Sequence, residues 1–270
     1  MKKILALMLV ALMAFSLFAC AKETPAPAAV DPTPTAEAPV VEEPVDVEEP
    51  PVVEEPAETV AVMTYAEYIA ADLDTEVTVE TYVQAKQGWW ADQATFYTQD
   101  EDGAYFIYNM PISEADYDLL VAGTKIRVTG YKAEWAGEIE IIDATFEIID
   151  GNFIATALDA TALLGTDELI NHQNELVIFK GLTVEDAGNG DAFMFNWDGS
   201  GEVDNSDLYF NVSLDGATYT FTVEQYLTGP GTDVYEAVKG LAIGEVIDAE
   251  GFLYWYEGAN PHITSVTVVG

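Results

Sequence analysis

One curled-strand pattern occurs twice in this chain, and it constrains the fold more than any other feature. Residues 123–130 place Thr-Lys-Ile-Arg-Val-Thr between two glycines, and residues 244–251 place Glu-Val-Ile-Asp-Ala-Glu between two glycines at the same spacing. Apolar residues at alternate positions predict a strand with one buried face. A glycine within a strand marks a bend where two backbones approach closely. The offset of about 121 residues, from Gly123 to Gly244, therefore predicts two copies of one β-rich unit.

The surroundings of the pattern agree with a duplication. Trp135 and Gly137 follow the first copy, and Trp255 and Gly258 follow the second at nearly the same distance. Alternation and turn residues predict strands in the first half at residues 76–83, 94–98, 104–110, 125–131 and 138–149. Additional strands are expected in the second half at residues 176–184, 192–197, 208–214 and 218–223, with an extra hairpin at residues 215–216. Short helices are expected at residues 65–71, 113–121 and 235–241.

Five strands with a helix between the third and the fourth resemble the oligonucleotide/oligosaccharide-binding fold, the OB-fold. The resemblance implies a mainly β protein with two tandem five-stranded OB-like barrels and short helices. The predicted domains are residues 61–150 and 174–270, joined by a connector at residues 151–173 with short helical pieces. A single β-sandwich remains the alternative, because alternation and turns do not by themselves separate a barrel from a sandwich.

The N-terminus predicts export. Lys2 and Lys3 precede an apolar run that ends at Phe18, which is the pattern of a secretory signal peptide. The sequence Leu-Phe-Ala-Cys around Cys20, the only cysteine, resembles the lipobox of bacterial lipoproteins. That resemblance implies removal of residues 1–19 and attachment of lipid (palmitate or another acyl chain) to Cys20. Two acyl chains suffice for a stable membrane anchor, so the expected location is the outer side of a cell membrane, extracellular or periplasmic. The alternative is a free cysteine after an ordinary signal peptide.

Residues 20–60 predict a disordered linker. Nine of the 12 prolines lie here, the sequence Pro-Val-Val-Glu-Glu-Pro occurs twice, and aromatic residues are absent. Proline favours the extended polyproline II conformation, and repeated glutamates repel one another. The segment is expected to hold the folded part away from the membrane. Its alternative role is a proline-motif ligand for another protein.

The charge balance bears on the partners. The chain has 48 acidic residues against 9 Lys and Arg, a formal net charge of −39. Nucleic-acid binding draws much of its affinity from the neutralisation of phosphates by Lys and Arg. We therefore expect nucleic acid to be an unlikely partner. Lys125, Arg127 and Lys132 are close in the sequence and either meet an anionic ligand or offset neighbouring carboxylates.

No catalytic set, cofactor motif or metal motif is found. The two histidines, His172 and His262, lie about 90 residues apart without a cysteine partner, and the sequence lacks a phosphate-binding glycine loop. We therefore expect no enzyme, no cofactor and no metal. The acidic residues of the second half do not have the spacing of an EF-hand, and we interpret them as a solvated loop, with a calcium site as the alternative: Glu185, Asp186, Asp191, Asp198, Glu202, Asp204 and Asp207.

Aromatic residues give the candidate binding site. OB-folds bind their ligands on the second and third strands and on the loops at their edges, and flat rings stack on sugars, on bases or on cationic side chains. The predicted ligand is an oligosaccharide or envelope glycan. A structural or adhesive role in binding another protein is the alternative, and a single-stranded nucleic acid is the third. About half of these rings are expected to fill the barrels instead. The candidate residues are Trp89, Trp90, Tyr97, Tyr105, Tyr108, Trp135, Trp197 and Trp255.

Overall fold

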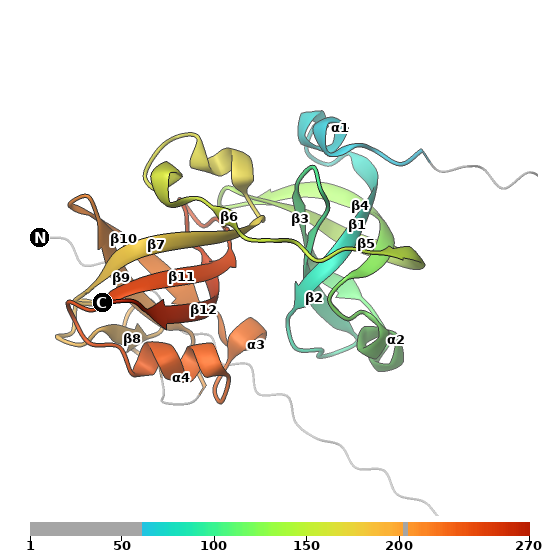
Figure 1. The fold of residues 1–270 in the computed structure, drawn as a ribbon. Helices are drawn as coiled ribbons and strands as arrows, with labels where there is room; N and C mark the ends of the chain where they lie inside the picture. The colour runs from blue at the N-terminus through green and yellow to red at the C-terminus, as the bar shows by residue number, and fades with distance from the viewer. Residues whose placement is uncertain (1–60, 202–204) are drawn as a thin grey trace, which may run out of the picture. The chain divides into compact units, whose positions relative to one another are not determined.

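The computed structural model describes residues 61–201 and 205–270, and all of them belong to one compact unit (Figure 1). The predicted signal peptide, Cys20 and the predicted linker lie outside the described residues. No helix among the described residues has the length and apolar character needed to cross a membrane.

The first half of the unit is a closed five-stranded barrel. Its strands follow the order β1-β2-β3-β5-β4, and β4 pairs with β1 to close the barrel. β3 and β5 run parallel, and the other neighbours run antiparallel. The strands are β1 (Glu76–Lys86), β2 (Gln93–Gln99), β3 (Ala104–Pro111), β4 (Thr124–Trp135) and β5 (Glu138–Asn152). The helix α1 (Tyr65–Ala70) precedes the barrel, and α2 (Glu114–Leu119) lies between β3 and β4.

The second half repeats this order around another closed barrel. The strands β7, β11, β12, β10 and β9 are neighbours in turn, and the pairing of β7 with β9 completes the circle. β10 and β12 run parallel, as β3 and β5 do. The barrel strands are β7 (Leu176–Glu185), β9 (Leu208–Leu214), β10 (Ala217–Val223), β11 (Val246–Phe252) and β12 (His262–Val268). The shorter elements are β6 (Leu158–Asp159), η1 (Thr161–Leu163), η2 (Leu169–His172), β8 (Phe193–Phe195), α3 (Gln225–Thr228) and α4 (Asp233–Lys239).

The predicted fold is confirmed: the described chain is mainly β and forms two tandem OB-like barrels. A single β-sandwich is not what the chain forms. One assignment in the second half is wrong. The predicted strand at residues 192–197 contributes only the three residues of β8, which extends the sheet outside β9. The turn at Asp215 and Gly216 is therefore the regular hairpin between the second and third barrel strands, because β9 pairs directly with β10.

The repeated glycines lie at matching places in the two barrels. Gly130 lies where the register of β4 and β5 shifts, and Gly251 lies where the register of β11 and β12 shifts. Such bulges bend a strand and increase its twist, which a five-stranded barrel needs in order to close. The pattern that repeats in the sequence is thus the pattern that curves each barrel.

Each barrel encloses its own apolar core, and local caps fix the helices around it. Alternate residues of every barrel strand face inward, and burial of one large apolar side chain contributes about 1.5–3 kcal/mol. Thr64 and Glu67 form the predicted capping box at the start of α1. The largest buried side chains of the two cores are Tyr68, Phe96, Tyr105, Ile107 and Met110 in the first, and Phe179, Phe210, Phe221 and Tyr235 in the second.

Candidate functional site

A small aromatic cluster joins the two barrels. Tyr97 from β2 and Phe106 from β3 pack against Phe252 from β11, and all three are buried. The ring of Tyr97 lies 5.0 Å from that of Phe106 and 4.7 Å from that of Phe252. The outer face of β2 and β3 is the usual ligand surface of an OB-fold. In this chain the second barrel covers part of that surface.

His262 extends the cluster. The hydroxyl of Tyr97 and Nδ1 of His262 are 2.6 Å apart, and both residues are buried. Burial lowers the pKa of His262 to about 3 and raises the pKa of Tyr97 well above its usual value. The histidine is therefore neutral at pH 7, and the tyrosine hydroxyl donates to Nδ1. The ring of Tyr254 stacks on His262 at 4.2 Å, so the cluster also fixes the position of Tyr254.

Hydrogen bonds from the backbone and from amide side chains frame this cluster. The backbone N–H of Gly88 donates to the carbonyl of Tyr226 at 2.8 Å, and the N–H of Glu257 donates to the carbonyl of Ala136 at 2.7 Å. The N–H of Leu176 donates to Oε1 of Gln99 at 2.8 Å. Directional bonds of this kind, together with the apolar cluster, hold the two barrels in one arrangement.

Glu138, at the start of β5, is a fully buried carboxyl at the same junction. Its Oε2 accepts the backbone N–H of Trp255 at 2.8 Å. Burial raises the pKa of Glu138 to about 8, although the bonds from Asn174 and Trp255 act in the opposite direction. Among the described residues, neither Oε1 of Glu138 nor Oδ1 of Asn174 has a hydrogen-bond donor. Because burial raises its pKa to about 8, we infer that Glu138 is largely neutral at pH 7.

Beside this junction lies a hollow of about 620 Å³, which we call the aromatic cleft. Tyr108 reaches it from β3, Trp135 from the end of β4, and Trp197 from the loop after β8. These three side chains are 45 %, 61 % and 75 % exposed. The cleft is lined by Gln87, Phe106, Tyr108, Trp135, Trp197, Asp207, Tyr209, Glu224, Tyr254, Tyr256, Glu257, Asn260 and His262.

A second hollow of about 560 Å³ continues the cleft along the first barrel. The two hollows share Gln87 and Tyr108. Trp90 and Tyr226 add two further exposed rings. Together the hollows form an elongated surface with aromatic rings along its length, which suits a chain-like ligand.

The cleft is acidic. Asp207, Glu224 and Glu257 line it, and neither Lys nor Arg is among the residues that line the two hollows. Burial is the main cause that raises the pKa of Glu224 to about 7, and it also raises the pKa of Asp207. Glu224 accepts the backbone N–H groups of Tyr226 and Leu227 and so caps α3. At pH 7 a large fraction of Glu224 therefore carries a proton.

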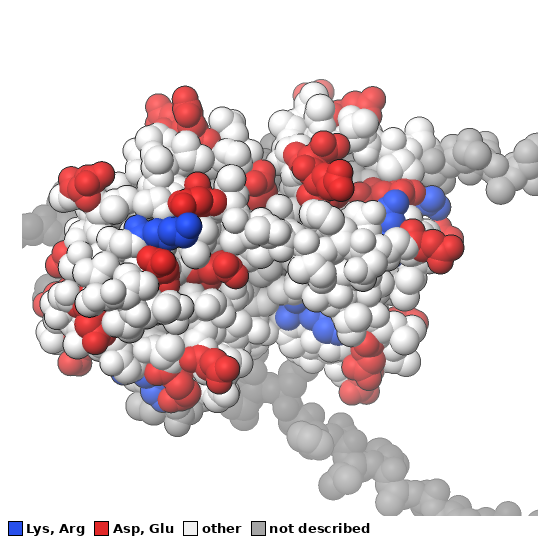
Figure 2. Space-filling view, in the orientation of Figure 1, with Lys and Arg blue, Asp and Glu red and all other residues white. Residues whose placement is uncertain are grey.

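Acidic side chains are also more widespread than basic ones on the visible surface of the two barrels (Figure 2). Figure 2 shows Asp and Glu over both barrels, with Lys and Arg in a few separate places. The predicted basic group does not form an anion site. Lys125 and Arg127 both bind Glu80, at 2.7 and 2.8 Å. The amine of Lys132 donates to three backbone carbonyls at the end of α1. These three cations offset carboxylates or cap a helix.

The structure divides the eight aromatic candidates into two groups. Five of them line the elongated surface: Trp89, Trp90, Tyr108, Trp135 and Trp197. The other three, Tyr97, Tyr105 and Trp255, line neither hollow, which corrects the prediction for them. Tyr97 is covered by the second barrel, and Tyr105 lies in the first core with its hydroxyl on Asp100. Trp89 and Trp255 pack against the two cores, and Nε1 of Trp89 donates to the carbonyl of Ile112.

Sequence reasoning did not select several residues of this surface. Tyr209 lies between the buried Leu208 and Phe210. Because side chains alternate along a strand, this pattern predicts that the Tyr209 side chain points outward. Tyr226 belongs to the four-residue helix α3, which the sequence does not indicate, and Glu224 caps that helix. Tyr254 and Tyr256 lie in the loop after β11. Among residues 61–201 and 205–270, no group of three His, Cys, Asp or Glu side chains is placed to hold a metal ion. Glu202 and Asp204 lie outside that part of the chain.

Several solved structures resemble this chain, although its sequence matches no family model and no curated protein. A murine DNA-binding protein bound to double-stranded DNA is 10 % identical over 72 % of this chain and 96 % of its own, with a TM-score of 0.35.

Two other similar structures are named for single-stranded DNA. A deletion mutant of the single-stranded DNA-binding protein from Thermus aquaticus is 13 % identical over 72 % of this chain and 93 % of its own, with a TM-score of 0.25. A Replication Protein A heterotrimer bound to single-stranded DNA is 12 % identical over 70 % of this chain and 50 % of its own, with a TM-score of 0.28.

These descriptions name DNA, and none of them names a sugar. The comparisons contradict the predicted glycan ligand, and they also contradict the prediction that nucleic acid is an unlikely partner. Both predictions are corrected accordingly.

Proposed function

We propose that this protein is a lipid-anchored binding protein, not an enzyme, whose aromatic cleft holds a single-stranded nucleic acid by stacking on its bases. The observation that supports the proposal most is the set of exposed rings along the OB face, with Trp90, Tyr108, Trp135 and Trp197 on one elongated surface. OB-folds bind oligonucleotides through this face and its flanking loops. Stacking of one base on an aromatic side chain contributes about 1–3 kcal/mol.

The acidic lining indicates how such a strand would lie. With neither Lys nor Arg on the cleft wall, the phosphates gain nothing from facing inward. The bases therefore enter the cleft and the phosphates face solvent. Glu224 is partly protonated at pH 7. Its ionised form can accept a hydrogen bond from a base edge, and its protonated form can also donate one.

This arrangement gives an unusual expected dependence on salt. When a protein neutralises Z phosphates of a single strand, the logarithm of its binding constant falls linearly with the logarithm of the salt concentration, with a slope of roughly −0.7Z. Here Z is close to zero, and added salt screens the repulsion between the acidic surface and the strand. The affinity should therefore stay constant or rise with salt.

The first prediction concerns the rings. We expect a labelled oligothymidine of about 12 nucleotides, within the range of OB site sizes, to bind the full chain saturably in fluorescence anisotropy. Trp135→Ala or Tyr108→Ala should weaken binding about tenfold, because each removes one stacking surface. Tyr131→Ala is the matched control, since Tyr131 is exposed on the same barrel and lines neither hollow.

Two outcomes would contradict the proposal. One is a steep loss of affinity between about 50 and 200 mM salt, the mark of phosphate contacts, together with no effect of Trp135→Ala. The other is the absence of oligonucleotide binding combined with tight binding of an arginine-rich peptide, which would indicate a cationic ligand for the acidic rings.

The anchor is proposed from the sequence alone. Cys20 is taken to carry lipid and to hold the barrels on the outer side of a cell membrane. We expect the wild-type chain to incorporate radiolabelled palmitate and to sediment with membranes. Cys20→Ser should abolish the labelling and release the protein from the membrane fraction. Labelling that survives Cys20→Ser would contradict this part of the proposal without affecting the cleft.

A further inference from the structure

His262 presents to the aromatic cleft a hydrogen-bonding group that the protein itself does not use. Its side chain is 7 % exposed and lines the cleft, and its Nδ1 faces the hydroxyl of Tyr97. Among residues 61–201 and 205–270, Nε2 of His262 has no hydrogen-bond partner, yet it is not sealed from solvent as the unpaired Oε1 of Glu138 is. A ligand in the cleft can therefore reach Nε2.

The hydrogen bonds of Tyr97 determine which nitrogen of His262 carries the proton. Burial raises the pKa of Tyr97, and a hydrogen bond from the Gln87 side chain acts in the opposite direction. A bond that lowers the pKa of a hydroxyl is donated to its oxygen, so the O–H of Tyr97 is free to donate to Nδ1 of His262. A neutral imidazole whose Nδ1 accepts carries its proton on Nε2. Nε2 is thus a hydrogen-bond donor on the cleft wall.

Glu224 supplies an acceptor on the same wall. Thr222 of β10 pairs with His262 of β12, and Glu224 follows Thr222 by two residues in extended backbone. Its side chain therefore leaves the sheet on the same side as that of His262. Nε2 of Gln87 donates to Oε2 of Glu224 at 3.1 Å and so links the two groups. In the described part of the chain, Oε1 of Glu224 accepts one bond, from the N–H of Tyr226, and has room for a second.

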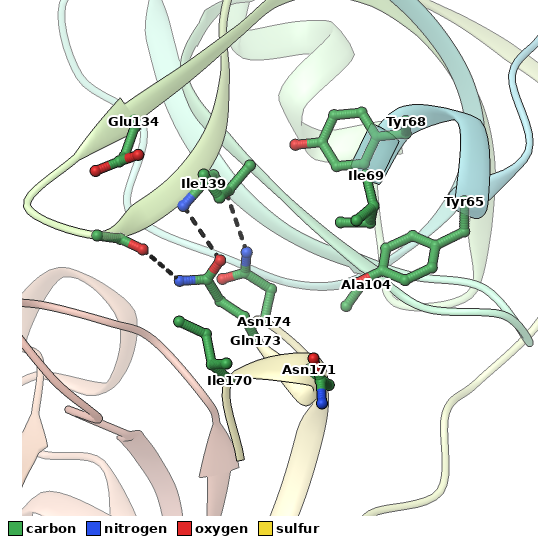
Figure 3. Close-up of a pocket in the computed structure, with 11 residues that line it drawn as sticks. Tyr65, Tyr68, Ile69, Ala104, Glu134, Ile139, Ile170, Asn171, Gln173 and Asn174 are labelled. Atoms are coloured by element: carbon green, nitrogen blue, oxygen red, sulfur yellow. Dashed lines mark hydrogen bonds between the residues drawn. The ribbon is translucent and has the colours of Figure 1, made fainter. Parts of the chain in front are cut away.

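The hollow beside α1 shows the contrast (Figure 3). It measures about 460 Å³, and its amide side chains are bonded to the turn between β4 and β5. Nε2 of Gln173 donates to the carbonyl of Gly137 at 2.8 Å, and Nδ2 of Asn174 donates to the carbonyl of Ile139 at 3.2 Å. The amide donors there hold the connector in place, whereas the donor of His262 is left for a ligand.

A donor beside an acceptor matches the Watson–Crick edge of every base. On that edge thymine and guanine place a carbonyl oxygen next to a ring N–H, and cytosine and adenine place an amino group next to a bare ring nitrogen. Each base therefore offers one acceptor to Nε2 of His262 and, directly beside it, one donor to Glu224. In a duplex the same atoms are bonded to the opposite strand.

We propose that one base of the bound strand presents its Watson–Crick edge to His262 and Glu224. It accepts a hydrogen bond from Nε2 of His262 and donates one to a carboxylate oxygen of Glu224. The inference rests on the proposed function and deepens it: the exposed rings hold bases by their faces, and this wall requires one base to be unpaired. The cleft thus selects single strands over duplexes without reading which base is present.

Fluorescence anisotropy of the full chain at pH 8, where most of Glu224 is ionised, tests this contact with two labelled strands of about 12 nucleotides. One is oligothymidine, and the other carries 3-methylthymine at every position, which keeps the ring face and blocks the ring N–H. We expect the methylated strand to bind about tenfold more weakly, the discrimination that one good pair of hydrogen bonds gives.

Variants assign this ratio to the wall. His262→Phe and Glu224→Gln should each bring the affinities of the two strands close together, because each removes one member of the donor–acceptor pair. Glu168→Gln, at an exposed position outside both hollows, should keep the tenfold ratio. Trp135→Ala should weaken both strands and also keep the ratio, since it removes a stacking surface and not an edge contact.

Nitrogen-15 NMR of the histidine rings supplies a measurement that needs no variant. His172 and His262 are the only histidines of the chain, so the spectrum is simple to assign. We expect Nε2 of His262 to be protonated in the free protein. Its signal should shift on addition of oligothymidine, while the signals of His172 stay in place.

The outcomes separate this inference from the proposed function. If neither strand binds the wild-type protein, the proposed function fails and this inference fails with it. If both strands bind with equal affinity, or if Nε2 of His262 carries no proton, the Watson–Crick contact is wrong while the stacking of bases in the cleft stands.

Discussion

Glu138→Gln is expected to remove the largest single contribution to the pH dependence of stability between about pH 5 and 8. In the wild-type protein the pKa of Glu138 is raised from 4.5 to about 8 by burial. Over this interval the folded state holds a proton that the unfolded state has released. Stability therefore falls by about 1.4 kcal/mol for each pH unit, in proportion to this one proton.

The sign follows from the raised pKa. The contribution is fully present below pH 4.5 and is lost as the pH rises toward 8, the reverse of a carboxylate held in an ion pair. The pKa of Glu140 and that of Glu224 are each raised to about 7 and act in the same direction over a narrower interval. The wild-type protein should thus lose stability from pH 5.5 to 8.5, with Glu138 as the main cause.

Glutamine preserves the contacts of the neutral acid. Its Oε1 can accept the N–H of Trp255, as Oε2 of Glu138 does in the wild-type protein. At pH 8 we expect the variant to be more stable than wild type by on the order of 3 kcal/mol, and at pH 5 to be nearly equal to it.

Urea unfolding followed by circular dichroism at several pH values measures this difference. Glu168→Gln, at an exposed position, is the control and should follow the wild-type curve. Equal slopes against pH for Glu138→Gln and wild type would contradict the inference that the buried carboxyl is neutral.

Gly251→Ala is expected to destabilise the second barrel by about 3 kcal/mol or more, beyond the usual cost of overpacking. A Cβ at this position would overlap the backbone carbonyl of His262 and lie 2.7 Å from Cα of Ile263. The obstacle is the backbone of β12, so no side-chain rotation relieves it. Either β11 and β12 separate or the bulge that curves the barrel is lost.

The first barrel offers a matched position. A Cβ at Gly130 would lie 2.7 Å from the carbonyl oxygen of Ile142, so Gly130→Ala should also be strongly destabilising. Gly240→Ala is the control, because its Cβ would lie 3.4 Å from the nearest oxygen and its φ is −89°. We expect a change within about 0.5 kcal/mol there.

Thermal and urea unfolding of the three variants check this prediction. A second consequence links it to function. His262 supports Tyr254 in the aromatic cleft, so any Gly251→Ala protein that still folds should bind the oligonucleotide more weakly. If Gly251→Ala proves as stable as Gly240→Ala, the repeated glycines are not what allows the barrel strands to curve.

The sequence by itself determined the class of fold and its duplication. The alternation of apolar and polar residues in strands such as residues 124–131 indicates which face of the strand lies in a core, because one face of a barrel strand is always buried. Gly130 and Gly251, the second glycine of each pair, mark the bends, since only glycine lets the backbones of neighbouring strands approach so closely. The capping box at Thr64 is likewise local, and it is present in the structure.

The binding surface was decided by tertiary structure. Tyr97 and Trp135 are equally plausible ligand contacts in the sequence, yet Tyr97 is buried by Phe252 and His262, while Trp135 stays exposed. Alternation separates inward from outward residues within one barrel and contains no information on which outward residues a second barrel covers. Glu138 shows the same limit. In the sequence it is one of 48 acids, and only the junction with Trp255 and Asn174 makes it buried and neutral. Contacts between residues 117 to 165 positions apart are set by how the barrels pack together, and no local pattern encodes them.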